Sequence, residues 1–477
     1  MHQVTSAVVL LTVLVVGFTT GCADQEKPPN IVLILIDDLG WTDLGVMGSE
    51  YYETPNIDGL AGQGMLFTQA YANAPNCAPS RASLLSGQYA PRHGVYTVGA
   101  AARGDPIHRR LIPIENQTTL SLETITIAEA LQSAGYVTGH FGKWHLGGAG
   151  YLPTDQGFDV NVAGNELGTP PSYFYPYEGA RGQLSDLVQT GTANEYLTDR
   201  LTDEALRFLE ANAERPFFLY LSHYAVHTPI RAKDAIVDRF RDKEVQAGHN
   251  NPIYAAMVYS VDESVGRVMS KLEELGIQEN TVVFFFSDNG GFGPVTSMAP
   301  LRGSKGMLYE GGIREPLIVR WPGVIEAGGT TDEQVIGTDL YPTILEITGA
   351  ARPTGQTLDG VSLVPVLSGT EELTERPLFW HFPAYLEADR SVTGPWRTTP
   401  VGVVRRGRYK LLQFFENNRL ELYELVSDVA EQRNLATALP DTTRQLLQLL
   451  EDWRAATGAP VPTEPNPEFD RSTNRDR

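Results

Sequence analysis

The chain has 477 residues, of which 37 are basic and 58 are acidic, and its formal net charge is −21 at pH 7. This charge excludes a general attraction to nucleic acid, so any anionic substrate must be bound by local positive charge. The chain is longer than one hydrophobic core usually serves, and we therefore expect one large domain and a smaller one.

A short apolar segment opens the chain. Residues 7–18 are almost entirely apolar, but a membrane-spanning helix needs about 20 such residues. We therefore interpret residues 1–22 as an export signal. The segment that ends at Cys22 resembles a bacterial lipobox, which predicts a lipid anchor at Cys22 and a location in the periplasm or cell envelope. An ordinary cleaved secretion signal is the alternative.

The chain contains two cysteines, Cys22 and Cys77. Cys22 would be lipidated or removed, which leaves Cys77 without a disulfide partner in an exported protein. A lone thiol is a liability there unless its chemistry is used. A buried and inert thiol is the alternative interpretation.

Helices and strands alternate along the first two thirds of the chain. Such alternation is typical of a parallel sheet, whose strands are continuous apolar runs because both faces are covered. The clearest predicted helices are residues 125–133 and 253–275, the second ending before Gly276. The predicted strands are residues 31–36, 136–141, 216–221 and 282–286.

The pattern changes after residue 370 to short strands joined by polar turns, which predicts an antiparallel sheet. A helix over residues 442–456 has an apolar side and is expected to cover this sheet. We thus predict a large domain over residues 23–372, a smaller subdomain over 373–460 and a flexible, Pro-rich tail over 461–477. The four short strands are residues 378–382, 401–404, 409–415 and 420–425.

Acidic and amide side chains follow two of the predicted strands. Asp37 and Asp38 follow the first strand, and Asp288 and Asn289 follow the fourth. Ligands of open α/β sheets bind beyond the carboxyl ends of the strands, where these side chains would meet. Three carboxylates would repel one another unless a cation lay among them, and oxygen ligands favour Ca²⁺ or Mg²⁺. Caps and turn residues are the alternative interpretation.

The segment around Cys77 carries the most specific motif. Pro79 suits the first turn of a helix, which places Cys77 at the positive end, where an anionic nucleophile is favoured. Arg81 follows about one turn later and could reach back over the side chain at position 77. The run resembles the type I sulfatase signature Cys-x-Pro-Ser-Arg-x-x-x-Leu-x-Gly, matched by Cys77, Pro79, Ser80, Arg81, Leu85 and Gly87.

The resemblance to this family covers residues 29–436. It implies an alkaline phosphatase-like α/β fold, with a large, mostly parallel sheet flanked by helices and a smaller C-terminal antiparallel sheet plus helix. It implies that Cys77 becomes Cα-formylglycine (3-oxoalanine) through a separate maturase. The implied metal ligands, for Ca²⁺ in preference to Mg²⁺, are Asp37, Asp38, Cys77, Asp288 and Asn289. The implied catalytic residues are Cys77, Arg81, Lys143, His145, His227 and Lys305.

Chemistry gives a separate reason for this conversion. A thiolate that attacked sulfur would leave an adduct without an easy exit, whereas an aldehyde hydrate has one hydroxyl to attack and a second to expel sulfate. We expect the metal to activate the attacking hydroxyl and Asp288 to take its proton. His227 or Lys305 would protonate the leaving alcohol, and His145 would deprotonate the second hydroxyl. The basic side chains of the site would neutralise the sulfate oxygens.

These features predict an exported sulfuric ester hydrolase that releases sulfate from an organic sulfate, either a sulfated small molecule or, in view of export, a sulfated saccharide. One alternative is a phosphate or phosphonate monoester hydrolase of the same superfamily. Another is a lipoprotein that binds anionic glycans without turnover. Loops 92–116 and 150–194 are expected to set specificity.

Two further groups are weaker candidates for contact with the substrate. Arg92 and His93 follow the signature helix, and we expect them to lie behind the substrate site. The aromatic side chains of residues 173–177 either stack on sugar rings or pack within their own loop. These aromatic residues are Tyr173, Phe174, Tyr175 and Tyr177.

Overall fold

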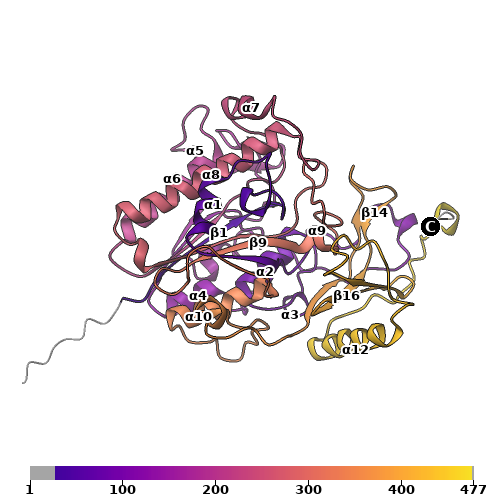
Figure 1. Ribbon diagram of the computed structural model, residues 1–477. Coiled ribbons are helices and arrows are strands. Elements are labelled where there is room, and N and C mark those ends of the chain that lie inside the picture. Colours follow the sequence, from indigo (N-terminus) through magenta and orange to yellow (C-terminus); the bar gives the residue numbers. More distant parts are fainter. Residues whose placement is uncertain (1–26, 475–477) are drawn as a thin grey trace, which may run out of the picture.

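A nine-stranded sheet forms the centre of the protein in the computed structural model, which describes residues 27–474 (Figure 1). Most neighbouring strands are parallel, but β9 (Arg314–Arg320) runs antiparallel to both of its neighbours. The sheet order is β10 (Gly329–Thr331), β2 (Met65–Tyr71), β9, β8 (Thr281–Ser287), β1 (Asn30–Ile36), β7 (Phe217–Ser222), β3 (Val137–Gly142) and β4 (Val160–Val162), and β11 (Val335–Ile336) also pairs with β2.

The central strands are apolar because both faces of the sheet are covered. Every residue of β1, β7 and β8 is buried, and such strands read as continuous apolar runs. Each of the four strands predicted for this sheet is present, with bounds that differ by no more than one residue from those of β1, β3, β7 and β8.

Helices pack on both faces of the sheet (Figure 1). The longest, α8 (Pro252–Glu274), begins after Asn251, whose side chain accepts hydrogen bonds from the first free N–H groups, and its apolar side packs on the sheet. The shorter α4 (Ile127–Ser133) begins at a capping box formed by Thr126 and Glu129. One face holds α1 (Pro55–Gly62), α6 (Leu197–Asn212), α7 (Asp234–Phe240) and α8 (Pro252–Glu274), and the other holds α2 (Cys77–Ser86), α4 (Ile127–Ser133), α10 (Leu340–Thr348) and α11 (Val364–Leu367).

A smaller antiparallel sheet follows in the chain and carries its own helix (Figure 1). The ring of Trp453 stacks on Phe379 with centroids 4.7 Å apart, and Leu446 and Leu450 are buried below it. These contacts and the large sheet confirm the predicted fold class. The strands are β12 (Leu378–Phe382), β15 (Val401–Arg406), β16 (Tyr409–Phe414) and β17 (Arg419–Glu424), and the helix is α12 (Pro440–Thr457).

The C-terminal segment differs from the expected flexible tail. Residues 464–470 lie along residues 106–112 and exchange backbone hydrogen bonds with them. The side-chain amide of Asn466 also donates to the carbonyl oxygens of Pro106 and Arg109, each over 2.8 Å. The Pro-rich composition excludes a long helix or strand, but it does not prevent this local pairing.

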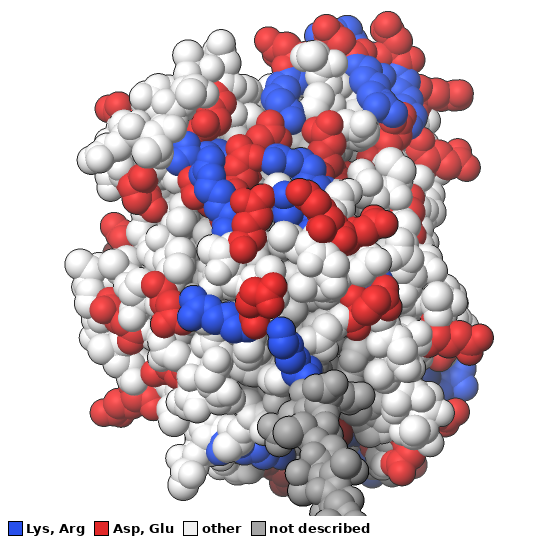
Figure 2. Space-filling view, turned by 90° about the vertical axis from the view of Figure 1, so that its left-hand side faces the viewer, with Lys and Arg blue, Asp and Glu red and all other residues white. Residues whose placement is uncertain are grey.

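Charges of both signs are interspersed on the face shown in Figure 2, where Lys and Arg side chains lie next to Asp and Glu. None of the helices within residues 27–474 combines the length and the apolar character needed to cross a membrane. The predicted export signal and Cys22 lie outside the described residues.

Candidate active site

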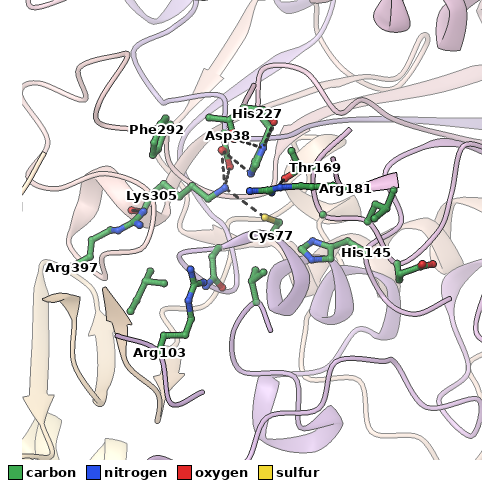
Figure 3. A pocket seen from close by; sticks show the side chains of 17 residues that line it. Asp38, Cys77, Arg103, His145, Thr169, Arg181, His227, Phe292, Lys305 and Arg397 are labelled. Carbon is green, nitrogen blue, oxygen red and sulfur yellow. Dashed lines mark hydrogen bonds and ion pairs between the residues drawn. The ribbon is translucent and has the colours of Figure 1, made fainter. Parts of the chain in front are cut away.

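Four neighbouring strands of the large sheet end at one cavity, with a volume of about 460 Å³. The segments that follow β1, β3, β7 and β8 bring their polar side chains to this edge, as expected for an open α/β sheet. Side chains around the cavity include Asp38, Cys77, Arg103, His145, Thr169, Arg181, His227, Lys305 and Arg397 (Figure 3). Glu166 also lines it.

Cys77 is the first residue of α2, and its side chain is buried at the cavity floor. The Nζ atom of Lys305 lies 3.7 Å from its Sγ atom. Burial acts to raise the pKa of the thiol, but Lys143 and Lys305 together with hydrogen bonds from His145 and His227 lower this pKa well below its usual value. Position 77 therefore favours a negatively charged group.

Arg81 lies one turn further along α2 and is fully buried. Its Nε atom donates to Asp288 Oδ2 over 2.7 Å, and its Nη1 atom donates to the Lys143 carbonyl and to Ser222 Oγ. The sequence did not predict these contacts. Its Nη2 atom has no hydrogen-bond partner among the described residues. One buried N–H group of this guanidinium thus remains available for a ligand.

The acidic side chains are held by two lysines that are distant in sequence. Lys143 Nζ donates to Asp37 Oδ2 over 2.6 Å, and Lys305 Nζ donates to both carboxylate oxygens of Asp38 over 2.6 and 2.7 Å. Asn289 Nδ2 donates to Asp38 Oδ1 over 2.8 Å. Asp38 itself has a φ of 63°, in the left-handed region that a non-glycine residue rarely adopts. The fold therefore holds the two carboxylates and the side chains that donate to them close together at this edge of the sheet.

Crowding changes the proton affinity of these carboxylates. Burial raises the pKa of Asp37 well above its usual value, and Asp288 adds to this effect, against the opposing charge of Lys143. Burial also raises the pKa of Asp288. For Asp38, burial acts in the same direction, but Lys305, His227 and Lys143 together outweigh it and the pKa is lowered. Two of the three carboxyl groups thus favour protonation unless further positive charge lies nearby.

The oxygen atoms of this group fit a hard divalent cation. Asp37 Oδ1 and Asn289 Oδ1 are buried and have no hydrogen-bond partner among the described residues. Ligand atoms of Asp37, Asp38, Cys77 and His227 lie within 4.8 Å of one another. Unpaired carboxylate and amide oxygens are the ligands that Ca²⁺ and Mg²⁺ prefer. The structure thus brings the predicted metal ligands together, and it adds His227 to that neighbourhood.

The two histidines differ in their surroundings. Burial lowers the pKa of His145 to about 4, so this imidazole is neutral at pH 7 and can accept a proton. Its backbone has a φ of 61°, and its Nδ1 atom has no hydrogen-bond partner among the described residues. His227 Nδ1 lies 2.8 Å from the Thr228 carbonyl, and its Nε2 atom lies 3.6 Å from Asp38 Oδ2. The other five predicted catalytic side chains therefore lie around Cys77.

The weaker candidates lie outside the cavity. Arg92 pairs with Asp359 at 2.8 Å, and the His93 ring lies 3.0 Å from Ser83 Oγ on the signature helix. Tyr173 and Tyr177 are fully buried, which confirms for these two the packing interpretation over a role in stacking on sugars.

Several cavity-lining side chains were not predicted individually. Arg103 lies in the loop 92–116, and Glu166, Thr169 and Arg181 lie in the loop 150–194, the two loops that were expected to set specificity. Arg397 belongs to β14 (Trp396–Thr398), which pairs with β13 (Leu386–Glu387). No sequence motif identifies these residues, because the role of a loop residue depends on the cavity that it lines in the folded protein.

Comparisons with known proteins agree with this geometry. The sequence matches the sulfatase family model over residues 29–350 and the model for the C-terminal region of N-sulphoglucosamine sulphohydrolase over residues 304–455. A protein named sulfatase from Formosa agariphila is 35% identical, over 92% of this chain and 91% of its own length. Human N-acetylgalactosamine-6-sulfatase is 35% identical over 76% and 70%, and human arylsulfatase A is 33% identical over 92% and 89%.

Solved structures of related proteins have a similar fold. The crystal structure of Ps i-CgsB in complex with k-i-k-neocarrahexaose is 28% identical with a TM-score of 0.76, and the match covers 94% of this chain and 96% of that one. The phosphonate monoester hydrolase of Agrobacterium radiobacter shares the fold, with a TM-score of 0.67, 21% identity and coverage of 90% and 96%.

Proposed function

The chain belongs to the sulfatase family of the alkaline phosphatase superfamily and is a sulfatase; from this premise we propose that it hydrolyses a sulfated saccharide through a formylglycine at position 77 beside a divalent cation. The saccharide is supported by the names of its relatives, which include N-acetylgalactosamine-6-sulfatase, and by a neighbouring structure with a bound neocarrahexaose. The cavity of about 460 Å³ is also large enough for a sugar residue.

The surroundings of Cys77 support its conversion to formylglycine. The side chain at this position lies at the positive end of a ten-residue helix, among two lysines and two histidines. A formylglycine hydrate supplies one hydroxyl that attacks sulfur and a second that later expels sulfate. This arrangement of cations and proton acceptors around position 77 is the observation that carries the proposal.

The cation would be held by Asp37, Asp38, Asp288 and Asn289, whose carboxylate and amide oxygens are the ligand types that fit Ca²⁺ or Mg²⁺. Two of these oxygens, Asp37 Oδ1 and Asn289 Oδ1, are buried without a hydrogen-bond partner among the described residues. Such an ion polarises the sulfate group and lowers the pKa of a neighbouring hydroxyl. Its positive charge would also keep the crowded carboxylates ionised, which the two lysines alone do not achieve for Asp37.

Each remaining side chain has a role that follows from its position. His145 is neutral and lies within hydrogen-bonding distance of the side chain at position 77, so it can take a proton from a hydroxyl there. Lys305 and His227 contact the same group from the cavity side and can protonate the departing alcohol. The free Nη2 of Arg81 and the ammonium of Lys143 would bind sulfate oxygens.

The test is a comparison of ester classes with protein coexpressed with a formylglycine-generating maturase. We expect a higher kcat/KM for 4-nitrophenyl sulfate and saccharide sulfates than for the corresponding phosphate esters. The reverse ranking would support a phosphate or phosphonate monoester hydrolase instead. Mass spectrometry of the peptide around Cys77 should show formylglycine, which is lighter than cysteine. An intact thiol without turnover would support a glycan-binding lipoprotein.

We also propose export, with a lipid anchor at Cys22. The proposal rests on the apolar run of residues 7–18 and the lipobox-like segment that follows it. In a bacterial host, the full chain should fractionate with membranes, and the Cys22→Ser variant should appear in the soluble exported fraction. A wild-type protein that is soluble after export would show that the signal is an ordinary cleaved one.

A further inference from the structure

The cationic side chains that line the cavity are not equally paired. Within the described part of the chain there are four of them, and three have a carboxylate partner. Lys305 pairs with Asp38 as described above. In the wall formed by β13 and β14, Arg103 pairs with Glu387, and Arg397 pairs with Asp389 at 3.2 Å. A carboxylate partner reduces the attraction of a cation for a second anion.

Arg181 is the exception. It lies at the turn between β5 (Glu178–Gly179) and β6 (Gly182–Gln183), and its side chain points into the cavity toward Cys77 and His227 (Figure 3). No carboxylate of the described residues forms an ion pair with it, and its Nη1 atom donates a hydrogen bond to Thr169 Oγ1 over 3.2 Å. Glu166 also lines the cavity, and it forms no ion pair with Arg181. The guanidinium is thus oriented by a neutral hydroxyl and keeps its charge for a ligand.

The scissile sulfate does not need this charge. Two lysines already lie at position 77: Lys305 Nζ is 3.7 Å from Cys77 Sγ, and Lys143 Nζ donates to the neighbouring Asp37. The buried Nη2 of Arg81 adds a further donor for the sulfate. Arg181 is exposed and belongs to the loop 150–194, so its guanidinium can meet parts of a bound saccharide that lie outside the buried cavity floor.

We propose that Arg181 binds a second anionic group of the substrate, so that the preferred substrate is a saccharide with a second sulfate or a carboxylate in addition to the sulfate ester that is cleaved. The inference rests on the proposed sulfatase action on saccharides. A planar guanidinium with five N–H donors suits both of these anions through paired hydrogen bonds, and the contact to Thr169 occupies only one donor. A free positive charge in the cavity of a protein with a net charge of −21 would also offset the general repulsion of a dianionic substrate.

The test uses the full chain coexpressed with a maturase and three matched disaccharides that carry the same scissile sulfate. One has no other charge, the second has an additional sulfate, and the third has an additional carboxylate. We expect wild-type protein to favour at least one of the doubly charged probes. In the Arg181→Ala variant, the ratio of kcat/KM for that probe to kcat/KM for the monosulfated probe should fall about tenfold, or 1.4 kcal/mol. The change should lie mainly in KM, because the contact is made equally in the ground and transition states.

A second variant controls for the loss of charge. Arg207→Ala removes the same charge from α6, where Arg207 is exposed and pairs with Glu204, and it should leave the ratio unchanged. Arg181→Lys should retain part of the preference, since it keeps the charge but loses the planar donors. Thermal unfolding should show that all three variants fold, because both positions are on the surface.

The outcomes separate this inference from the proposed function. Loss of preference for the disulfated probe identifies a second sulfate, and loss for the carboxylated probe identifies a carboxylate. An unchanged ratio in Arg181→Ala, or an equal fall on all three probes, overturns the inference while sulfatase action on saccharides stands. If wild-type protein with formylglycine at position 77 releases sulfate from 4-nitrophenyl sulfate but from no saccharide, the proposed substrate class fails, and this inference fails with it.

Discussion

Two clusters of buried charge, both within the described residues, show how differently such groups can be paired. The first surrounds position 77 at the end of the large sheet. The second, here called the junction cluster, consists of Glu310, Lys410 and Glu431 where the C-terminal sheet meets the large domain. Lys410 Nζ lies 3.0 Å from an oxygen of each glutamate, and each second oxygen accepts another hydrogen bond. All three side chains are fully buried.

Among the described residues, the junction cluster leaves one side-chain oxygen, Glu431 Oε1, without a hydrogen-bond partner although Lys410 Nζ lies 3.0 Å from it, whereas the active site leaves four buried polar atoms unsatisfied. Asp37 Oδ1, Asn289 Oδ1, Arg81 Nη2 and His145 Nδ1 are buried without a hydrogen-bond partner among the described residues. Unpaired buried groups cost free energy unless a ligand pairs with them. The comparison therefore distinguishes a cluster that holds the fold together from one prepared for an ion and an anionic substrate.

The largest expected effect is that of Cys77→Ala on turnover. Without the nucleophile, kcat for 4-nitrophenyl sulfate should fall by at least about 10⁴-fold, while the thermal midpoint should stay close to that of wild type. Wild-type protein made in a host without a maturase is the matched control and should be equally inactive. Hydrolysis at full speed by protein with an intact thiol would falsify the assignment of position 77.

Lys410→Met should act on stability and not on catalysis. The substitution removes the cation that two buried glutamates share and leaves Glu310 with Arg314 at 3.6 Å and Arg405 at 4.0 Å, so the free energy of unfolding should fall by about 3 kcal/mol. Urea unfolding measures this loss, and kcat per folded molecule should not change. Lys27→Met, at an exposed pair with Glu214, should cost less than about 0.5 kcal/mol. A large loss of kcat in Lys410→Met would contradict the separation of the two clusters.

Asp288→Asn should weaken calcium binding. The change removes a charged oxygen ligand but keeps the size of the side chain that pairs with Arg81. Changes near metal sites cost up to about 100-fold in affinity even outside the ligand set, so we expect a loss at least as large for this residue. Calorimetry measures the affinity. Asp359→Asn breaks an Asp–Arg pair outside the cavity and should leave the calcium affinity unaltered. Equal calcium affinities in the two variants would refute the proposed ligand set.

The smallest expected effect is a change in pH dependence in Glu431→Gln. Burial raises the pKa of Glu431 from 4.5 to about 7, although Lys410 opposes the shift. Between these values the folded protein keeps a proton that the unfolded chain has lost, so this group makes stability fall as the pH rises from 4.5 to about 7. The slope is at most about 1.4 kcal/mol per pH unit.

The glutamine side chain of the Glu431→Gln variant does not titrate, so the difference in unfolding free energy between this variant and wild type should shift in favour of the variant as the pH rises through this range. Urea unfolding at several pH values measures it. A difference that does not vary with pH would show that the glutamate titrates alike in the folded and unfolded states.

Sequence patterns were sufficient for the strands that are buried on both faces, because those are continuous apolar runs. They did not identify β9, in which Glu315 and Pro316 argue against a strand inside a sheet. The structure accommodates this proline where the pairing with β2 shifts register, between Phe67 and Ala70. A bulge of this kind depends on the partner strand and cannot be read from local sequence.

The location of the candidate site could also be predicted from the sequence, but the contacts within it could not. The signature around Cys77 and the acidic residues after two strands pointed to the correct edge of the sheet. The sequence did not show that Arg81 would be held by Asp288, or that Arg181 would reach the cavity from a hairpin turn. Such contacts depend on loops whose conformations are set by packing against distant segments.

The sequence by itself determined the chemical groups that are present: the cysteine signature, the acidic strand ends, and the lysines and histidines that accompany them. The tertiary structure decided which charges are neutralised and which remain free. Lys143 pairs with Asp37 across 106 positions, and Lys305 pairs with Asp38 across 267. The reason is electrostatic, since a charge is governed by its burial and by neighbours within a few ångströms, and those are fixed only when distant parts of the chain meet.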